Sequence, residues 1–149
     1  MEINYVLDLT EFIIINIFNL SVFALFLSRV KKPEVSKKIG IFSLSLGIPT
    51  LTIAIINLII QREWYYWFFP LLLVGFILFS LIVDYIKKIE FRNPRKKSIL
   101  LPFLILFYVN IILMWGLTWV LGVIYGGITA ITYFLQLFGA YYAGKHGVG

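Results

Sequence analysis

Four long stretches of this chain contain no charged residue, and this feature limits the possible folds more than any other. The stretches cover residues 12–28, 39–61, 64–83 and 98–144. A helix needs roughly 17–25 apolar residues to cross a hydrocarbon core of about 30 Å, and the first three stretches have about that length. The last stretch holds 47 residues and would extend about 70 Å as one helix. It therefore predicts two helices joined by a tight turn near 116–122.

The composition points the same way. Hydrophobic residues make up 61% of the chain and charged residues 13%, whereas roughly a quarter of a soluble domain is charged. We therefore predict an all-α fold, a polytopic integral membrane helical bundle that forms a single transmembrane domain over residues 1–149. The five expected transmembrane helices cover about 10–29, 39–61, 64–86, 98–117 and 121–143. A four-span bundle, with 121–143 as a re-entrant or surface helix, is the alternative.

The basic residues predict the orientation. Twelve of the thirteen fall at 29–38, at 87–97 or at Lys145, and only Arg62 falls on the other side of the expected membrane. Because basic loops are retained in the cytoplasm, we expect a multi-pass protein of the cell membrane with its N-terminus outside and its C-terminus in the cytoplasm. The basic residues are expected to contact anionic lipid headgroups there rather than nucleic acid; the set is Lys31, Lys32, Lys37, Lys38, Lys87, Lys88, Arg92, Arg95, Lys96 and Lys97.

Two expected helices carry a stripe of small and polar residues at alternating steps of three and four. Small residues let helix backbones approach closely within lipid, so these stripes predict helix-packing faces. The second helix contributes Gly40, Ser43, Gly47, Thr50, Ala54 and Asn57. The last contributes Gly122, Gly126, Thr129, Gln136 and Ala140. Pro49 lies within the first of these stripes and predicts a bend, because it cannot donate to the carbonyl of Ser45.

Five side-chain amides lie in the interior of the expected spans, away from their ends. Amides are costly within hydrocarbon unless they are hydrogen-bonded, so they either pair between helices or converge on a polar path or pocket. They are Asn16, Asn19, Asn57, Asn110 and Gln136. The first span has one further pattern, because Phe12 and Phe23 share the face that carries Asn16 and Asn19.

Residues for catalysis or metal binding are scarce. The chain has no cysteine and one histidine, His146, so we predict no catalytic residue, no metal site and no cofactor. Asp84 is expected at the inner membrane interface, paired with Lys87 or Lys88. Glu11, at the outer edge of the first span, is likewise expected to be an interfacial residue.

These features favour a non-enzymatic, multi-spanning membrane protein that is a subunit or assembly partner of a membrane complex, or a homo-oligomer. The two small and polar stripes support it, because they offer more close-packing surface than one five-helix bundle obviously needs. The alternative is a small carrier or channel for a neutral or hydrophobic solute. An enzyme that acts on lipid is a third possibility, although no acid–base pair or nucleophile is visible.

The expected orientation can be tested by labelling single cysteines introduced into this cysteine-free chain. Cysteines at Ser36 and at Asn93 should react with a membrane-impermeant maleimide only after the cytoplasmic side is opened. A cysteine at Gln61 should react in intact cells. Labelling of position 93 from outside would overturn the orientation.

Overall fold

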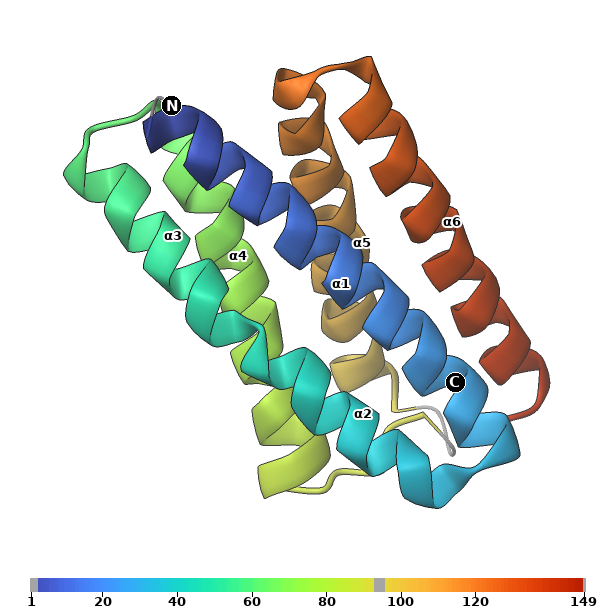
Figure 1. Ribbon diagram of the computed structural model, residues 1–149. Helices are drawn as coiled ribbons and strands as arrows, with labels where there is room; N and C mark the ends of the chain where they lie inside the picture. The colour runs from blue at the N-terminus through green and yellow to red at the C-terminus, as the bar shows by residue number, and fades with distance from the viewer. Residues whose placement is uncertain (1–2, 93–95, 149) are drawn as a thin grey trace.

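The computed structural model describes residues 3–92 and 96–148, and the structure in these residues is helical and loop (Figure 1). Within these residues, six α-helices follow one another: α1 (Ile3–Lys31), α2 (Pro33–Ser45), α3 (Gly47–Ile59), α4 (Trp64–Ser80), α5 (Lys97–Thr118) and α6 (Val123–Lys145). A π-helix, η1 (Leu81–Ile86), extends α4, and a 3-10 turn, η2 (Trp119–Leu121), extends α5. The prediction of an all-α bundle is confirmed.

Five helical segments are long and apolar enough to cross a membrane: α1, α2 with α3, α4 with η1, α5 with η2, and α6. Their outer faces are also apolar, with large side chains such as Ile48, Ile124, Ile131 and Phe134 well exposed. A contiguous apolar exterior of this kind suits contact with lipid rather than water. The first helix begins earlier than expected, at Ile3 rather than near residue 10.

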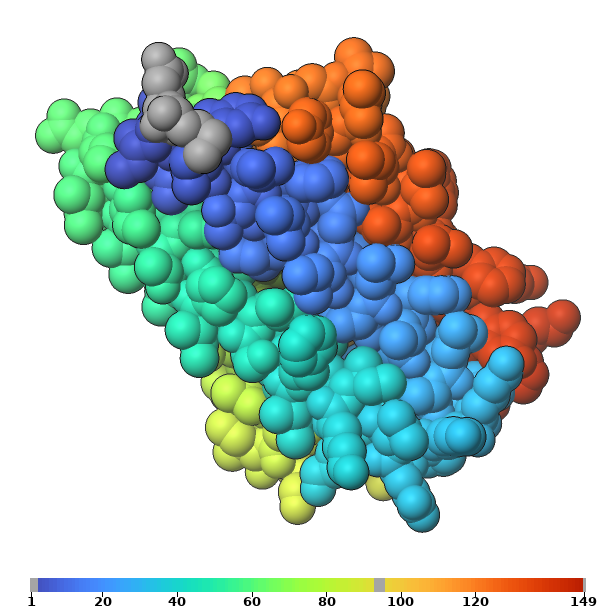
Figure 2. Space-filling view, viewed as in Figure 1, coloured from blue at the N-terminus to red at the C-terminus, as the bar shows by residue number. Residues whose placement is uncertain are grey.

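The helix α1 lies at the centre of the bundle's front face, between α2–α3 on one side and α6 on the other (Figure 1). The space-filling view shows its atoms filling the space between these two neighbours (Figure 2). The helices α4 and α5 lie behind α1 (Figure 1). We call the end that carries Lys31, Lys32 and Lys145 the basic end. The turns at residues 60–63 and 119–122 form the opposite end.

The second span is interrupted at Leu46, between α2 and α3. Pro49 lacks the amide hydrogen that would bond to the Ser45 carbonyl, so the helical ladder is broken at this point. The amide of Thr50 bonds to the Leu46 carbonyl at 3.2 Å and continues the helix beyond the break. The structure thus interrupts the helix one turn before Pro49, at the place where the sequence predicts a bend.

The long apolar stretch folds as two helices, α5 and α6, joined by η2 and Gly122. Gly122 has a φ of +129°, a value that suits glycine because it has no Cβ. The residue precedes α6, so its predicted place on a helix-packing face is wrong: it forms the turn instead. Because α6 packs along α1 as a helix of 23 residues, the structure favours five spans over the four-span alternative.

The close packing at Gly47 can be tested by comparison with Gly75 of α4, which has open space where a side chain would lie. A Cβ at Gly47 would lie 3.2 Å from Cγ2 of Ile77, whereas nothing lies within 4 Å of a Cβ at Gly75. We expect Gly47→Leu to lower the free energy of unfolding by about 1–3 kcal/mol through overpacking. Gly75→Leu should be neutral or slightly stabilising, because glycine is a poor helix residue. Thermal unfolding in mild detergent measures both, and equal midpoints would contradict the packing.

Candidate functional site

Hydrogen bonds between side chains join α1 to α6 in the middle of the bundle. The amide of Asn16 donates to Thr129 Oγ1 at 3.0 Å, and that of Asn19 donates to Thr132 Oγ1 at 3.1 Å. The Thr132 hydroxyl in turn donates to Asn16 Oδ1 at 2.7 Å. Two of the predicted amides therefore serve to join two helices.

Aromatic contacts extend this interface in both directions along α1. The Phe12 and Tyr125 rings meet edge to face, with their centroids 5.0 Å apart. A Cβ at Gly139 would lie 2.8 Å from the Phe23 ring, so only glycine leaves room for that ring. The residues of α1 that share a face in the sequence, Phe12, Asn16, Asn19 and Phe23, thus all contact α6.

The other three predicted amides do not join Asn16 and Asn19 in a network. Asn57 donates to the Tyr66 carbonyl at 3.0 Å near the opposite end. Asn110 donates to the Leu106 carbonyl of its own helix at 2.7 Å. Gln136 is 0% exposed, and its amide atoms have no hydrogen-bond partner among the described residues. The five amides therefore form no continuous polar path in the described part of the chain.

The small and polar stripe of the second span faces inward, toward helices of the same chain. Ser43 Oγ donates to Ser21 Oγ on α1 at 2.8 Å, and the Tyr85 hydroxyl occupies the space beside Gly40. Every predicted member of the stripe is buried; the set is Gly40, Ser43, Gly47, Thr50, Ala54 and Asn57. On α6, Gly126, Thr129 and Gln136 are buried as well, and Ala140 is partly buried.

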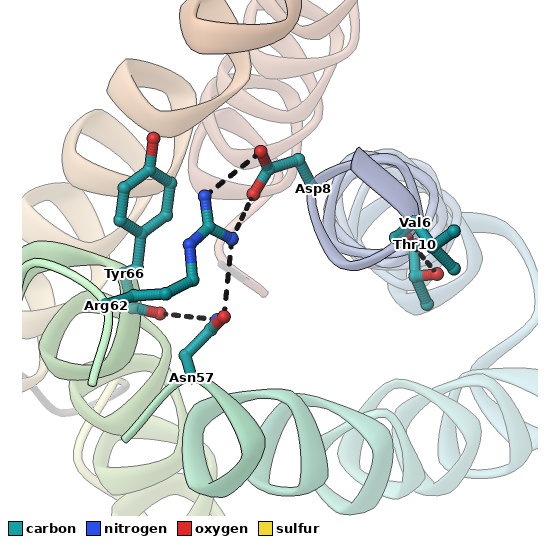
Figure 3. Close-up of polar contacts among 6 residues, drawn as sticks. All are labelled: Val6, Asp8, Thr10, Asn57, Arg62 and Tyr66. Atoms are coloured by element: carbon teal, nitrogen blue, oxygen red, sulfur yellow. Dashed lines mark hydrogen bonds and ion pairs between the residues drawn. The ribbon is translucent and has the colours of Figure 1, made fainter. Parts of the chain in front are cut away.

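A polar cluster closes the bundle at its opposite end (Figure 3). The Arg62 guanidinium donates to both carboxylate oxygens of Asp8, at 2.7 and 3.2 Å, and to Asn57 Oδ1 at 3.3 Å. It also lies over the Tyr66 ring, 3.5 Å from the centroid. Burial disfavours the charge of Arg62, but the bonds and charges of Asp8 and Tyr66 outweigh it and raise the pKa of the guanidinium above its ordinary value. The single basic residue of this end thus ties α1 to α3 and α4.

Glu11 lies on α1 near the Asp8–Arg62 pair. Its side chain is buried, and its Oε1 has no hydrogen-bond partner among the described residues. Glu11, expected as an interfacial residue, therefore lies buried within the bundle. The reason is the early start of α1 at Ile3, which places Glu11 beyond the second helical turn.

The candidate functional site is a cavity of about 530 Å³ toward the basic end, lined by residues of α1, α2, α4, η1, α5 and α6. Its walls are mainly aliphatic and aromatic, including Phe18, Val22, Phe76, Phe103 and Phe107. Ala140, one of the predicted packing residues, also lines it. A concave, mostly apolar cavity with a few polar groups is the usual form of a small-molecule site.

The polar groups of the cavity gather where it approaches the basic end. Arg92 Nη1 and Nη2 donate to the two oxygens of Asp84 at 2.6 and 3.0 Å, and the Ser80 hydroxyl donates to Asp84 at 3.2 Å. Arg29 and Tyr85 line the cavity beside this pair. Asp84 and Tyr85 lie in η1, and π-helical segments are often found at functional sites.

Arg92 corrects two expectations from the sequence. It was expected to contact lipid headgroups, but its side chain turns inward to Asp84 and is 20% exposed. Asp84 therefore pairs with Arg92 and not with Lys87 or Lys88, whose side chains are exposed. The remaining predicted headgroup residues in the described part of the chain are also exposed: Lys31, Lys32, Lys37, Lys38, Lys96 and Lys97. Arg95 lies outside the described residues.

Arg92 is positioned by a residue that the sequence analysis did not single out. Phe91 belongs to the loop after η1, yet it is 0% exposed and packs against Phe103 with ring centroids 5.3 Å apart. The guanidinium of Arg92 lies over both rings, 4.2 and 5.0 Å from their centroids. An aromatic residue within a charged loop was the only signal in the sequence.

The exposed residues that line the cavity belong to α5 and α6. Tyr108 of α5 and Tyr141 of α6 both line it, and both are exposed, Tyr141 at 69%. Toward the opposite end the same two helices are joined, because Trp115 Nε1 donates to the Gly126 carbonyl at 2.9 Å. From the exposure of these two tyrosines we infer that the cavity opens laterally, between α5 and α6.

Comparisons with models of protein families, with curated proteins and with solved structures find no match to this chain. In the part of the chain that the structure describes, no three histidine, cysteine, aspartate or glutamate side chains come together as they would around a metal ion.

Proposed function

We propose that this chain is a non-enzymatic, multi-spanning membrane protein that binds a lipid-like molecule in the cavity at the basic end. The observation that carries the proposal is a largely apolar cavity of about 530 Å³ whose lining includes two exposed residues, Tyr108 of α5 and Tyr141 of α6. Ligand pockets typically measure roughly 300–1,000 Å³. This function is close to the carrier for a hydrophobic solute that the sequence left as an alternative.

The lateral opening indicates how a ligand would enter. An apolar molecule dissolved in the bilayer is already concentrated beside the outer faces of α5 and α6. It can pass between Tyr108 and Tyr141 without crossing water. Inside the cavity the ligand exchanges its changing contacts with lipid tails for fixed contacts with the aromatic rings of the walls.

The assembly function receives less support from the structure than from the sequence. In the sequence, the small and polar stripes exceed what one bundle obviously needs. The stripe of the second span, however, is buried against α1 and α4 of the same chain, and Thr129 of the last span bonds to α1. An assembly partner or a homo-oligomer remains a prediction that rests on no identified surface.

The orientation belongs to the proposal as well. The lysines around the basic end support a cytoplasmic position for that end, next to anionic headgroups. The cavity would then open to the cytoplasmic leaflet of the cell membrane. A ligand drawn from that leaflet would enter with its polar group toward the basic end.

The cavity can be tested by filling it. Leu104 of α5 lines the cavity, whereas Ile105, the next residue, is 60% exposed and does not line it. We expect a photoactivatable long-chain alcohol to label cavity residues of α1, α5 and α6 in the purified protein. Leu104→Trp should reduce this labelling about ten-fold, because the indole takes the space of the chain. Mass spectrometry of peptides maps the labelled residues.

Ile105→Trp is the matched control, since it adds the same side chain to the lipid-facing side of the same helix. It should leave cavity labelling unchanged, and both variants should keep the unfolding temperature of the wild type within a few degrees. Labelling confined to outward-facing residues, and equal in the two variants, would contradict the proposed function.

A further inference from the structure

The geometry points to a more specific ligand: a single-chain amphiphile whose anionic head group, a carboxylate or a phosphate, binds Arg29 and Arg92. This inference rests on the proposed function and names the chemistry of its ligand. Its basis is the set of charged side chains that line the cavity, namely Arg29, Asp84 and Arg92.

These three side chains leave one positive charge without a matching negative charge. Asp84 is 14% exposed and is held by Arg92 through two hydrogen bonds. Among the described residues, no carboxylate oxygen lies within 4.0 Å of Arg29. Glu34 and Glu90, which lie nearest this end in the sequence, are exposed and do not line the cavity. A single anion would balance the charge.

The donors around this charge suit a carboxylate or phosphate. A guanidinium offers five N–H donors in a planar fork that matches two oxygens of such a group. Arg92 directs Nη1 and Nη2 to Asp84, which leaves its remaining donors and those of Arg29 for a ligand. The hydroxyl of Tyr85 also lines the cavity and can donate to a further oxygen of a head group.

The length of the cavity suits one acyl chain of a single leaflet. Along α1 the lining runs from Phe18 to Arg29, which is about 16 Å at about 1.5 Å per residue. One leaflet contributes roughly half of the 30 Å hydrocarbon core. With its head at Arg29, an extended chain would therefore end near Phe18. The volume is that of a site for a drug-sized ligand, and this size favours one chain over the two of a phospholipid.

Other ligand classes fit the same cavity less well. A cationic amphiphile would bring a second uncompensated positive charge beside Arg29, in surroundings where charges are poorly screened. A neutral alcohol would fill the apolar part but leave the charge of Arg29 unbalanced. The head group, and not the chain, therefore sets the selectivity.

The experiment compares four probes that share a sixteen-carbon chain, namely hexadecanoic acid, hexadecyl phosphate, hexadecanol and hexadecylamine. Each competes with the photoactivatable alcohol for the whole protein in nanodiscs of zwitterionic lipid. We expect the acid or the phosphate to compete about ten-fold more strongly than the alcohol, because charge-assisted hydrogen bonds are the stronger kind. The amine should be the weakest competitor. The better of the two anions identifies the head group.

Three variants assign the effect to the cavity. Arg29→Gln should reduce competition by the preferred anion to the level of the alcohol, while hexadecanol itself competes as before. Lys31→Gln, an exposed lysine two residues along, removes the same charge outside the cavity and should change nothing. Asp84→Asn releases Arg92 and should strengthen binding of the anion, a gain that simple misfolding cannot produce.

The outcomes separate this inference from the proposed function. If the four probes compete equally for labelling that still maps to the cavity, the ligand is not selected by charge, and the inference fails while the proposed function stands. If none competes at the cavity, both fail. Equal competition by a two-chain phosphatidic acid, or an unchanged preference in Arg29→Gln, would also overturn the inference.

Discussion

Within hydrocarbon there is no water to satisfy an amide or a hydroxyl, so the polar groups of a membrane helix must bond within the protein. In this chain the constraint acts most clearly between α1 and α6. Asn16 and Asn19 bond to Thr129 and Thr132 across the two helices. The bonds fix both the spacing of the helices and the rotation of each about its axis, and the remaining architecture depends on that rotation.

Because one face of α1 packs against α6, the neighbouring face of α1 lines the cavity. Phe18, Val22 and Arg29 line the cavity, whereas Asn16 and Asn19 contact α6. At the far end of the cavity α4 continues into a π-helix that contains Asp84, and the loop after it brings Arg92 to that carboxylate. Arg29, which also lines the cavity, has no carboxylate partner among the described residues. The opposite end differs, because the guanidinium of its arginine, Arg62, already has partners within the protein. It bonds to Asp8 and Asn57 and lies over the Tyr66 ring.

The sequence could predict the features that depend on local chemistry. Long uncharged stretches predict the five spans, Pro49 predicts the break after Ser45, and the shared face of Phe12, Asn16, Asn19 and Phe23 predicts a contact surface on α1. The sequence could not predict which helix packs against each surface, because the spacing of residue types along a helix does not identify its neighbour. Arg92 and Asp84 illustrate this: lysines lie nearer to Asp84 in sequence, but the burial of Phe91 brings Arg92 inward instead. The cavity could not be predicted either, because its lining comes from α1, α2, α4, η1, α5 and α6, and the sequence does not say how these elements are arranged around one another.

The central claim is that the bonds between α1 and α6 fix the bundle, and a double-mutant cycle tests it most directly. Asn19→Leu and Thr132→Val remove the two partners at nearly constant volume, and unfolding in lipid–detergent mixtures measures each variant and the pair. The account predicts a coupling free energy of roughly 0.6–1.7 kcal/mol, the range from average to maximum for such bonds in a membrane protein. Thr52→Val, on an exposed residue of α3 that bonds to its own helix, should show no coupling to Asn19→Leu. A coupling of zero between Asn19 and Thr132 would contradict the account.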